Sequence, residues 1–488
     1  MRFLPLPEEV AEPQEKPVLG QLLEPSTERK SYAQLLAIFD DALTKLQRPT
    51  ELRGLVQFYR AGLLLNEQRQ PQALDAIEES IRLLPSYSGP LINAAAIYAY
   101  ANQPGKGTDY FLRAAQIDPE SVRRVDDYEV NNLLRRLTYA RDERRARALS
   151  DKLLEIGWVG NNLDSRSSLA ATAIEQRLDD GDVKGAQMLV PKLLVPQHSY
   201  ELLIDKKYAP IWPDLEAWGG PKLQNQWSTY LREAHDRWAA SKDVETVRTY
   251  LGALRTAGHN RTIIRDILPL FYGKLDPIQD MDLQFVVTGV AAALANEGRW
   301  VEVNRVFQRA QEVWPLRRDN PNSLNVAANW ASYLLFEGKP EEALAKMDVA
   351  IEFARQWDVN PDAIGLMHHY RACMLHVLGR DSEMGSSIRI ATATGFPADV
   401  AGLHLCTGNR SAALRVLIEG LESETSRGSV LSFIQKDSSP PLPCDYSNEL
   451  QVETDRLRTD PHLLAKVSEY GRLLPYGLSE GAPPESAF

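Results

Sequence analysis

The chain has 488 residues, of which 44% are hydrophobic and 25% are charged, and its formal net charge is −11. This length exceeds what one hydrophobic core ordinarily holds, so we expect several domains or an elongated array of repeats. The negative charge gives no general attraction to nucleic acid or to anionic membranes.

Neither end of the chain nor its interior suggests a membrane segment. No apolar stretch approaches about 18 residues, so we expect no transmembrane helix. Pro5 and Pro7 interrupt the first residues, and an acidic stretch follows where a signal peptide would be apolar. This favours a cytoplasmic location, and a periplasmic one stays open if a native signal has been removed.

The three cysteines, Cys373, Cys406 and Cys444, are sparse and mostly widely spaced. An odd and sparse set of this kind is not typical of a disulfide framework. The cysteine content therefore predicts a reducing compartment without excluding an oxidising one.

In chain order, residues 1–30 are rich in Pro and Glu, and we expect an extended or disordered tail. From Ser31 onward, apolar residues recur at three- and four-residue spacing, which predicts a helix over about 31–47. Further helices of roughly 12 to 16 residues follow, separated by Gly, Pro, Asn or Asp, and no alternating pattern predicts a strand.

An internal repeat organises these helices. The segments Tyr59–Pro85 and Leu91–Pro119 superimpose at a shift of 34 residues, so that Ala61 aligns with Ala95 and Leu64 with Tyr98. Small residues at such offsets let two antiparallel helices approach closely, and larger residues fill the space beside them. The same template recurs in the second half at Ala291, Gly298 and Ala310, at Ala331, Gly338 and Ala343, at Ala372, Gly379 and Ala391, and at Ala401, Gly408 and Ala413.

This 34-residue pattern resembles the tetratricopeptide repeat, and the stretch 457–462 resembles the closing segment of bacterial proteins of this kind. The resemblance implies an all-α solenoid of antiparallel helix pairs in a right-handed superhelix with two halves. We expect a tail over 1–30, repeats over 31–205, a Trp- and Pro-rich connector over 206–225, repeats over 226–423, and a linker, capping helical segment and tail over 424–488.

The resemblance also implies a concave groove that binds an apolar or amphipathic segment of another protein. In the first half, Ile92 and Ala96 fall at groove positions. The candidate groove residues are Phe58, Tyr100, Phe285, Thr288, Ser332, Leu335, Phe336, His369, Cys373 and His376. A second interpretation leaves no groove for a partner, because these residues pack on one another or on the chain's own Pro-rich tail.

His369, Cys373 and His376 have the spacing i, i+4 and i+7, which places them on one helical face. They could hold a metal ion if His404 or Cys406 supplied a fourth ligand. The interpretation that we prefer is a polar patch in the groove without a metal or other cofactor.

No Gly-x-Ser-x-Gly or His-Glu-x-x-His motif is present, so the sequence supports no catalytic mechanism. The Arg-rich stretch 123–147 is interleaved with acidic residues, which indicates a mixed surface and no nucleic-acid partner. The sequence thus predicts a non-catalytic scaffold or adaptor. The alternatives are a ligand- or metal-responsive regulatory module and, third, an enzyme built on a repeat scaffold.

Overall fold

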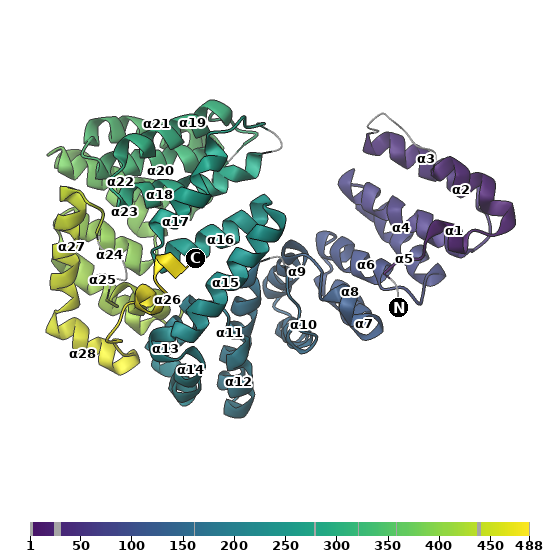
Figure 1. Ribbon diagram of the computed structural model, residues 1–488, viewed down its shortest axis with the longest axis horizontal. Coiled ribbons are helices and arrows are strands. Elements are labelled where there is room, and N and C mark those ends of the chain that lie inside the picture. The colour runs from purple at the N-terminus through teal and green to yellow at the C-terminus, as the bar shows by residue number, and fades with distance from the viewer. Residues whose placement is uncertain are drawn as a thin grey trace. The chain divides into compact units, whose positions relative to one another are not determined.

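The computed structural model describes residues 3–23, 31–160, 162–277, 280–320, 322–357, 359–436 and 441–487. Within these ranges the chain forms 28 α-helices and several short 3₁₀ helices (Figure 1). The only β pairing in the described ranges consists of two isolated bridges, Asp205–Gly471 and Arg317–Asn320. The predicted all-α fold is confirmed.

The chain divides into two compact units, Met1–Ala173 and Ile174–Phe488, and the division falls within α11. The helices that begin in the first unit are α1 (Pro7–Val10), α2 (Lys16–Leu22), α3 (Tyr32–Lys45), α4 (Glu51–Asn66), α5 (Gln70–Leu83), α6 (Gly89–Tyr100), α7 (Pro104–Ile117), α8 (Pro119–Val122), α9 (Asp127–Tyr139), α10 (Glu143–Glu155) and α11 (Leu163–Asp179).

The second unit contains the other helices. They are α12 (Val183–Leu189), α13 (Pro196–Ile204), α14 (Trp212–Gly219), α15 (Gln224–Ser241), α16 (Val244–Ala257), α17 (Asn260–Asp266), α18 (Gln284–Asn296), α19 (Trp300–Val313), α20 (Asn322–Phe336), α21 (Pro340–Gln356), α22 (Pro361–Val377), α23 (Gly385–Thr394), α24 (Pro397–Cys406), α25 (Arg410–Glu422), α26 (Glu424–Phe433), α27 (Asp445–Arg458) and α28 (Pro461–Tyr470).

Within each unit, consecutive helices pack as antiparallel pairs, and each pair packs on the next. The first unit has the pairs α4–α5, α6–α7 and α9–α10, and the second has α15–α16, α18–α19, α20–α21, α22–α23 and α24–α25. The small residues of the repeat template lie at the helix contacts, where Ala61, Ala291, Ala310 and Ala343 are 0% exposed. A methyl group at these points allows close helix packing, as the repeat predicts.

The turns inside the pairs explain why the template is clearer in the second half. Gly298 and Gly338 have φ angles of +70° and +85°, a conformation that glycine adopts without steric cost. Gln68 and Asn102 hold the same left-handed conformation in the first unit, with φ angles of +60° and +57°. The backbone geometry is therefore kept where the glycine signature is missing.

The first described residues differ from the expected extended tail, which is a correction for residues 3–23. They contain α1 and α2, and Val18 and Leu19 are buried in a small core with Ala42, Leu52 and Val56. Burial of apolar side chains on α2 favours this ordered arrangement over a solvated tail. The sequence pattern missed them because α2 is only seven residues long.

The Trp- and Pro-rich stretch expected as a connector packs inside the second unit. It forms a 3₁₀ helix (Lys206–Ile211) and α14. The indole N–H of Trp212 donates to the carbonyl of Leu202, and that of Trp218 donates to the carbonyl of Leu193, each at 3.0 Å. The division between units therefore lies some thirty residues before this stretch.

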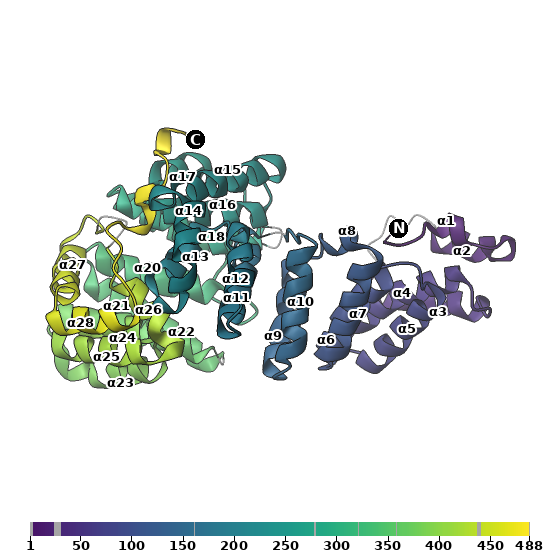
Figure 2. The same ribbon diagram turned by 90° about the horizontal axis from the view of Figure 1, so that it is seen from below.

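The C-terminal segment 471–487 returns to the first helices of the second unit instead of fraying (Figures 1 and 2, yellow). The Arg472 N–H donates to the carbonyl of Ile204, and the Trp227 indole donates to the carbonyl of Leu478, both at 2.9 Å. The carbonyl of Pro483 accepts from His259 Nε2 at 2.9 Å. We call residues 471–487 the C-terminal strap. Of the linker predicted before α27, residues 438–440 lie outside the described ranges.

We expect the substitution Ala310→Asp to lower the free energy of unfolding by on the order of 3 kcal/mol or more, because it buries an unpaired carboxylate between helices. Urea unfolding of the full chain measures the change. The matched control is Val301→Asp on the same helix, where the native side chain is 72% exposed and the change should stay within about 0.5 kcal/mol. Equal effects of the two substitutions would contradict the helix packing described above.

Candidate functional site

The chain's own helix α27 covers part of the predicted groove in the second unit. Tyr446 of α27 packs on Phe336 with ring centroids 5.8 Å apart, and Leu450 packs on the same core. Helix α27 contacts α20, α24 and α25. This contact comes from the C-terminal helix α27, whereas the second interpretation made from the sequence named the chain's own Pro-rich tail.

Several predicted groove residues of the second unit have partners within the chain. Ser332, Leu335 and Cys373 are buried, and the Ser332 hydroxyl donates to the carbonyl of Ala328. The Thr288 hydroxyl accepts from the side-chain amide of Asn329 at 3.0 Å. Phe285 remains exposed, with the Arg248 guanidinium 4.5 Å from its ring centroid.

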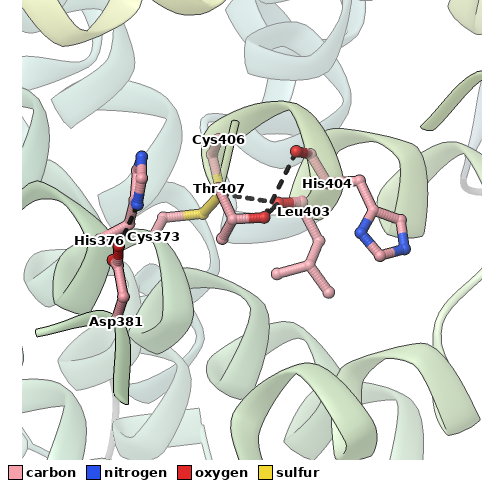
Figure 3. Close-up of a disulfide and its surroundings, with 7 residues drawn as sticks. All are labelled: Cys373, His376, Asp381, Leu403, His404, Cys406 and Thr407. Carbon is pink, nitrogen blue, oxygen red and sulfur yellow. Dashed lines mark hydrogen bonds and ion pairs between the residues drawn. A yellow bond between two sulfur atoms is a disulfide. The ribbon is translucent and has the colours of Figure 1, made fainter. Parts of the chain in front are cut away.

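Cys373 of α22 and Cys406 of α24 form a disulfide, with their Cα atoms 5.5 Å apart (Figure 3). The sparse cysteines, which the sequence did not identify as a disulfide framework, thus include one bonded pair. The two residues are 33 positions apart, close to one repeat length. Because α22 and α24 begin successive pairs and pack side by side, this separation brings the sulfur atoms together.

The predicted trio of His369, Cys373 and His376 does not assemble. His376 Nδ1 pairs with the Asp381 carboxylate at 3.0 Å, and Figure 3 shows the His404 ring pointing away from the disulfide. A ring nitrogen of His369 and the sulfurs of Cys373 and Cys406 lie within 4.8 Å of one another. Burial lowers the pKa of His369 to about 4, so its imidazole is neutral at physiological pH.

The first unit has an open cavity of about 240 Å³ on the first helices of its three pairs. We call its walls the first-unit groove; they include Phe58 of α4, Ile92, Asn93 and Ala96 of α6, and Leu133 of α9. Its lining is mainly apolar. Tyr100 lies farther along α6, where its hydroxyl is 3.3 Å from that of Tyr128 and the Arg136 guanidinium is 5.5 Å from its ring centroid.

The chain's own N-terminal residues border this groove. The Phe3 ring meets that of Phe58 edge to face, with centroids 6.4 Å apart. The carbonyl of Phe3 accepts from the Gly89 N–H at 2.9 Å, and a Cβ at residue 89 would lie only 2.7 Å from that oxygen. Because residue 89 is a glycine, the extended segment at Phe3 fits against the start of α6.

Glu129 is the polar feature of the first-unit groove that sequence reasoning missed. Its Oε2 atom is buried and has no hydrogen-bond partner in the described part of the chain. Burial, helped by the nearby Asp126 carboxylate, raises the pKa of Glu129. A glutamate in the first turn of a helix is common for reasons of the helix dipole, so the sequence alone does not single it out.

Comparison with known proteins finds no matching family model and no matching curated protein. Among solved structures, the chain is similar to yeast Tom70 (13% identity, 90% of this chain and 96% of that chain, TM-score 0.33). It is also similar to the apo quorum sensor NprR from B. thuringiensis (12% identity, 91% of this chain and 99% of that chain, TM-score 0.35). A further similar structure is human IFIT1 in a dimer with m7Gppp-AAAA (12% identity, 92% of this chain and 100% of that chain, TM-score 0.34).

The class of protein follows from the packing within the chain. Stacked antiparallel helix pairs with buried small residues at their contacts define a TPR-like helical-repeat protein. Across the residues that the structure describes, no helix combines the length and the apolar character needed to cross a membrane.

We expect Glu129→Gln to stabilise the protein at neutral pH, because the raised pKa shows that the folded state disfavours the ionised carboxylate. The wild-type carboxyl favours folding most below its ordinary pKa of 4.5, and this contribution is lost as pH rises through the raised value. The stability gained by Glu129→Gln should therefore be smallest below pH 4.5 and should grow as the pH rises above it.

Urea-unfolding midpoints of the full chain at several pH values test this expectation. The matched control is Glu67→Gln, which neutralises an exposed glutamate in the same unit and should change stability by less than about 0.5 kcal/mol. A gain that is the same at all pH values would show that the carboxylate carries no ionisation penalty.

Proposed function

We propose that this protein is a non-catalytic scaffold or adaptor that holds a segment of another protein in the first-unit groove. The observation that carries the proposal is an open apolar cavity on the first helices of three successive pairs, α4, α6 and α9. We also propose a bacterial origin, which the sequence resemblance implies.

The lining of the groove indicates the chemistry of the partner. Phe58, Ile92 and Leu133 suit an apolar side chain, whose burial contributes about 25 cal/mol per Å² of apolar surface. Glu129 Oε2 requires a hydrogen-bond donor once water is displaced from the groove. A lysine or arginine would satisfy it with a charge-assisted hydrogen bond. We therefore propose a partner segment with an apolar anchor residue followed or preceded closely by a basic residue.

The way Phe3 borders the groove supports an extended partner. Its carbonyl bonds to the Gly89 N–H, so a backbone group from an extended chain already meets the start of α6. A partner segment could continue this contact toward Ile92 and Ala96, with its side chains reaching the cavity.

The disulfide bears on the proposed location. Disulfides persist in oxidising compartments, which favours the periplasmic alternative over the cytoplasmic one. The regulatory-module alternative also keeps a specific observation in its support, namely the His369 and cysteine cluster treated in the next subsection.

Selection of a random peptide library on the full chain tests the groove. Enriched peptides should contain an apolar anchor and a basic residue, and Ile92→Asp should weaken their binding at least about tenfold, since it places a charge in the apolar cavity. Glu129→Gln should reduce the preference for the basic residue while keeping the apolar one. Binding is measured by calorimetry with purified peptides.

Tyr139→Asp is the control variant, because Tyr139 of α9 is 79% exposed and lies outside the groove lining. It should bind the selected peptides like the wild type. Selected peptides that bind the folded Ile92→Asp variant with unchanged affinity would refute the first-unit groove as the site.

A further inference from the structure

Three metal-binding groups meet between two helices of the second unit. Cys373 and His369 lie one turn apart on α22, and Cys406 ends α24 beside them. Their donor atoms lie within 4.8 Å of one another. Two thiolates and one imidazole form a donor set that suits Zn²⁺, which takes Cys and His ligands in tetrahedral sites.

His369 provides an independent sign of a ligand. Its Nδ1 atom is buried and has no hydrogen-bond partner among the residues described. The other histidine on this face of the helix differs, because His376 Nδ1 is held by Asp381. A buried imidazole nitrogen without a partner costs free energy unless an ion or a donor satisfies it.

We infer that the Cys373–Cys406 pair has two alternative states, a disulfide and a thiolate pair that binds Zn²⁺ together with His369. The two states exclude each other, because a tetrahedral zinc ion with Zn–S bonds of about 2.3 Å holds two sulfurs about 3.8 Å apart. Both states join α22 to α24, so the helix contact is kept while its chemistry changes.

The conversion balances with a dithiol as the reductant. The dithiol transfers two electrons and two protons to the disulfide, so the S–S bond breaks, two Cys S–H groups form, and the dithiol becomes a disulfide. Zn²⁺ then displaces one proton from each Cys thiol and binds the thiolates. His369 binds as the neutral imidazole, and water fills the fourth position.

An ion can reach the cluster through a cavity of about 230 Å³ beside His369. The cavity lies between α22, α23 and α24, and its lining includes Leu366, Asp399 and Leu403. Burial raises the pKa of Asp399. The mainly apolar lining limits solvent at the sulfurs and still leaves the imidazole accessible from one side.

Metal titration of the full chain tests this inference. The chain is prepared in air-oxidised form and in dithiol-reduced form, and the reduced form is desalted without oxygen. Zn²⁺ binding is measured by competition with a chromogenic chelator. Co²⁺ replaces Zn²⁺ in a parallel titration, in which absorption typical of tetrahedral thiolate ligation reports the ligands.

The reduced chain should bind one Zn²⁺ and the oxidised chain none at this site. His369→Gln and Cys406→Ser should each weaken Zn²⁺ binding by more than about 100-fold. This exceeds the loss of metal affinity expected when only a residue that hydrogen-bonds to a ligand is changed. The control variants are His376→Gln, on the same helix, and Cys444→Ser, which removes the free thiol. Both should bind like the wild type.

Reduced wild-type protein that stays folded by circular dichroism but binds no Zn²⁺ would overturn the inference. An equal loss in His376→Gln and His369→Gln would overturn it as well. If Cys406→Ser does not fold, His369→Gln still decides the question, because it leaves the disulfide intact in the oxidised form.

Discussion

The fold depends on close packing between helices at residues with little or no side chain. Ala61, Ala291, Ala310 and Ala343 are fully buried where helices meet, and any longer side chain there would push the pairs apart. Each pair buries only the faces that meet its neighbours, so a stack leaves an apolar inner surface. The two units treat that surface differently: α27 covers part of it in the second, and the first keeps an open cavity.

The repeat period predicted most of this architecture because it depends on local spacing. The helix start at Ser31, whose hydroxyl accepts from the Gln34 N–H, was readable for the same reason. The ordering of α1, α2 and the C-terminal strap was not readable. These segments are held by contacts far along the chain, such as Trp227 with Leu478, which no short-range pattern contains.

The candidate site shows the same limit. The repeat template placed Phe58, Ile92 and Ala96 at groove positions, and the structure brings them together around one cavity. The template also named Leu335 and Phe336, but it has no position for Tyr446, which packs on them from α27. The disulfide does not follow from the number of cysteines, because it depends on which helices a repeat-length separation places side by side. Glu129 was missed because burial, not sequence position, makes it unusual.

Hydrogen exchange of the C-terminal strap tests most directly the claim that the end of the chain folds back on the second unit through contacts far apart in the sequence. The amides of Arg472 and Leu474 donate to Ile204 and to Gln435, both within the second unit. They should exchange at least about 100-fold more slowly than an unstructured chain, whereas the exposed loop residues 273 and 274 serve as the unprotected reference. Exchange of the strap at the rate of an unstructured chain would contradict the account, because the strap would then not be held on α13 and α15.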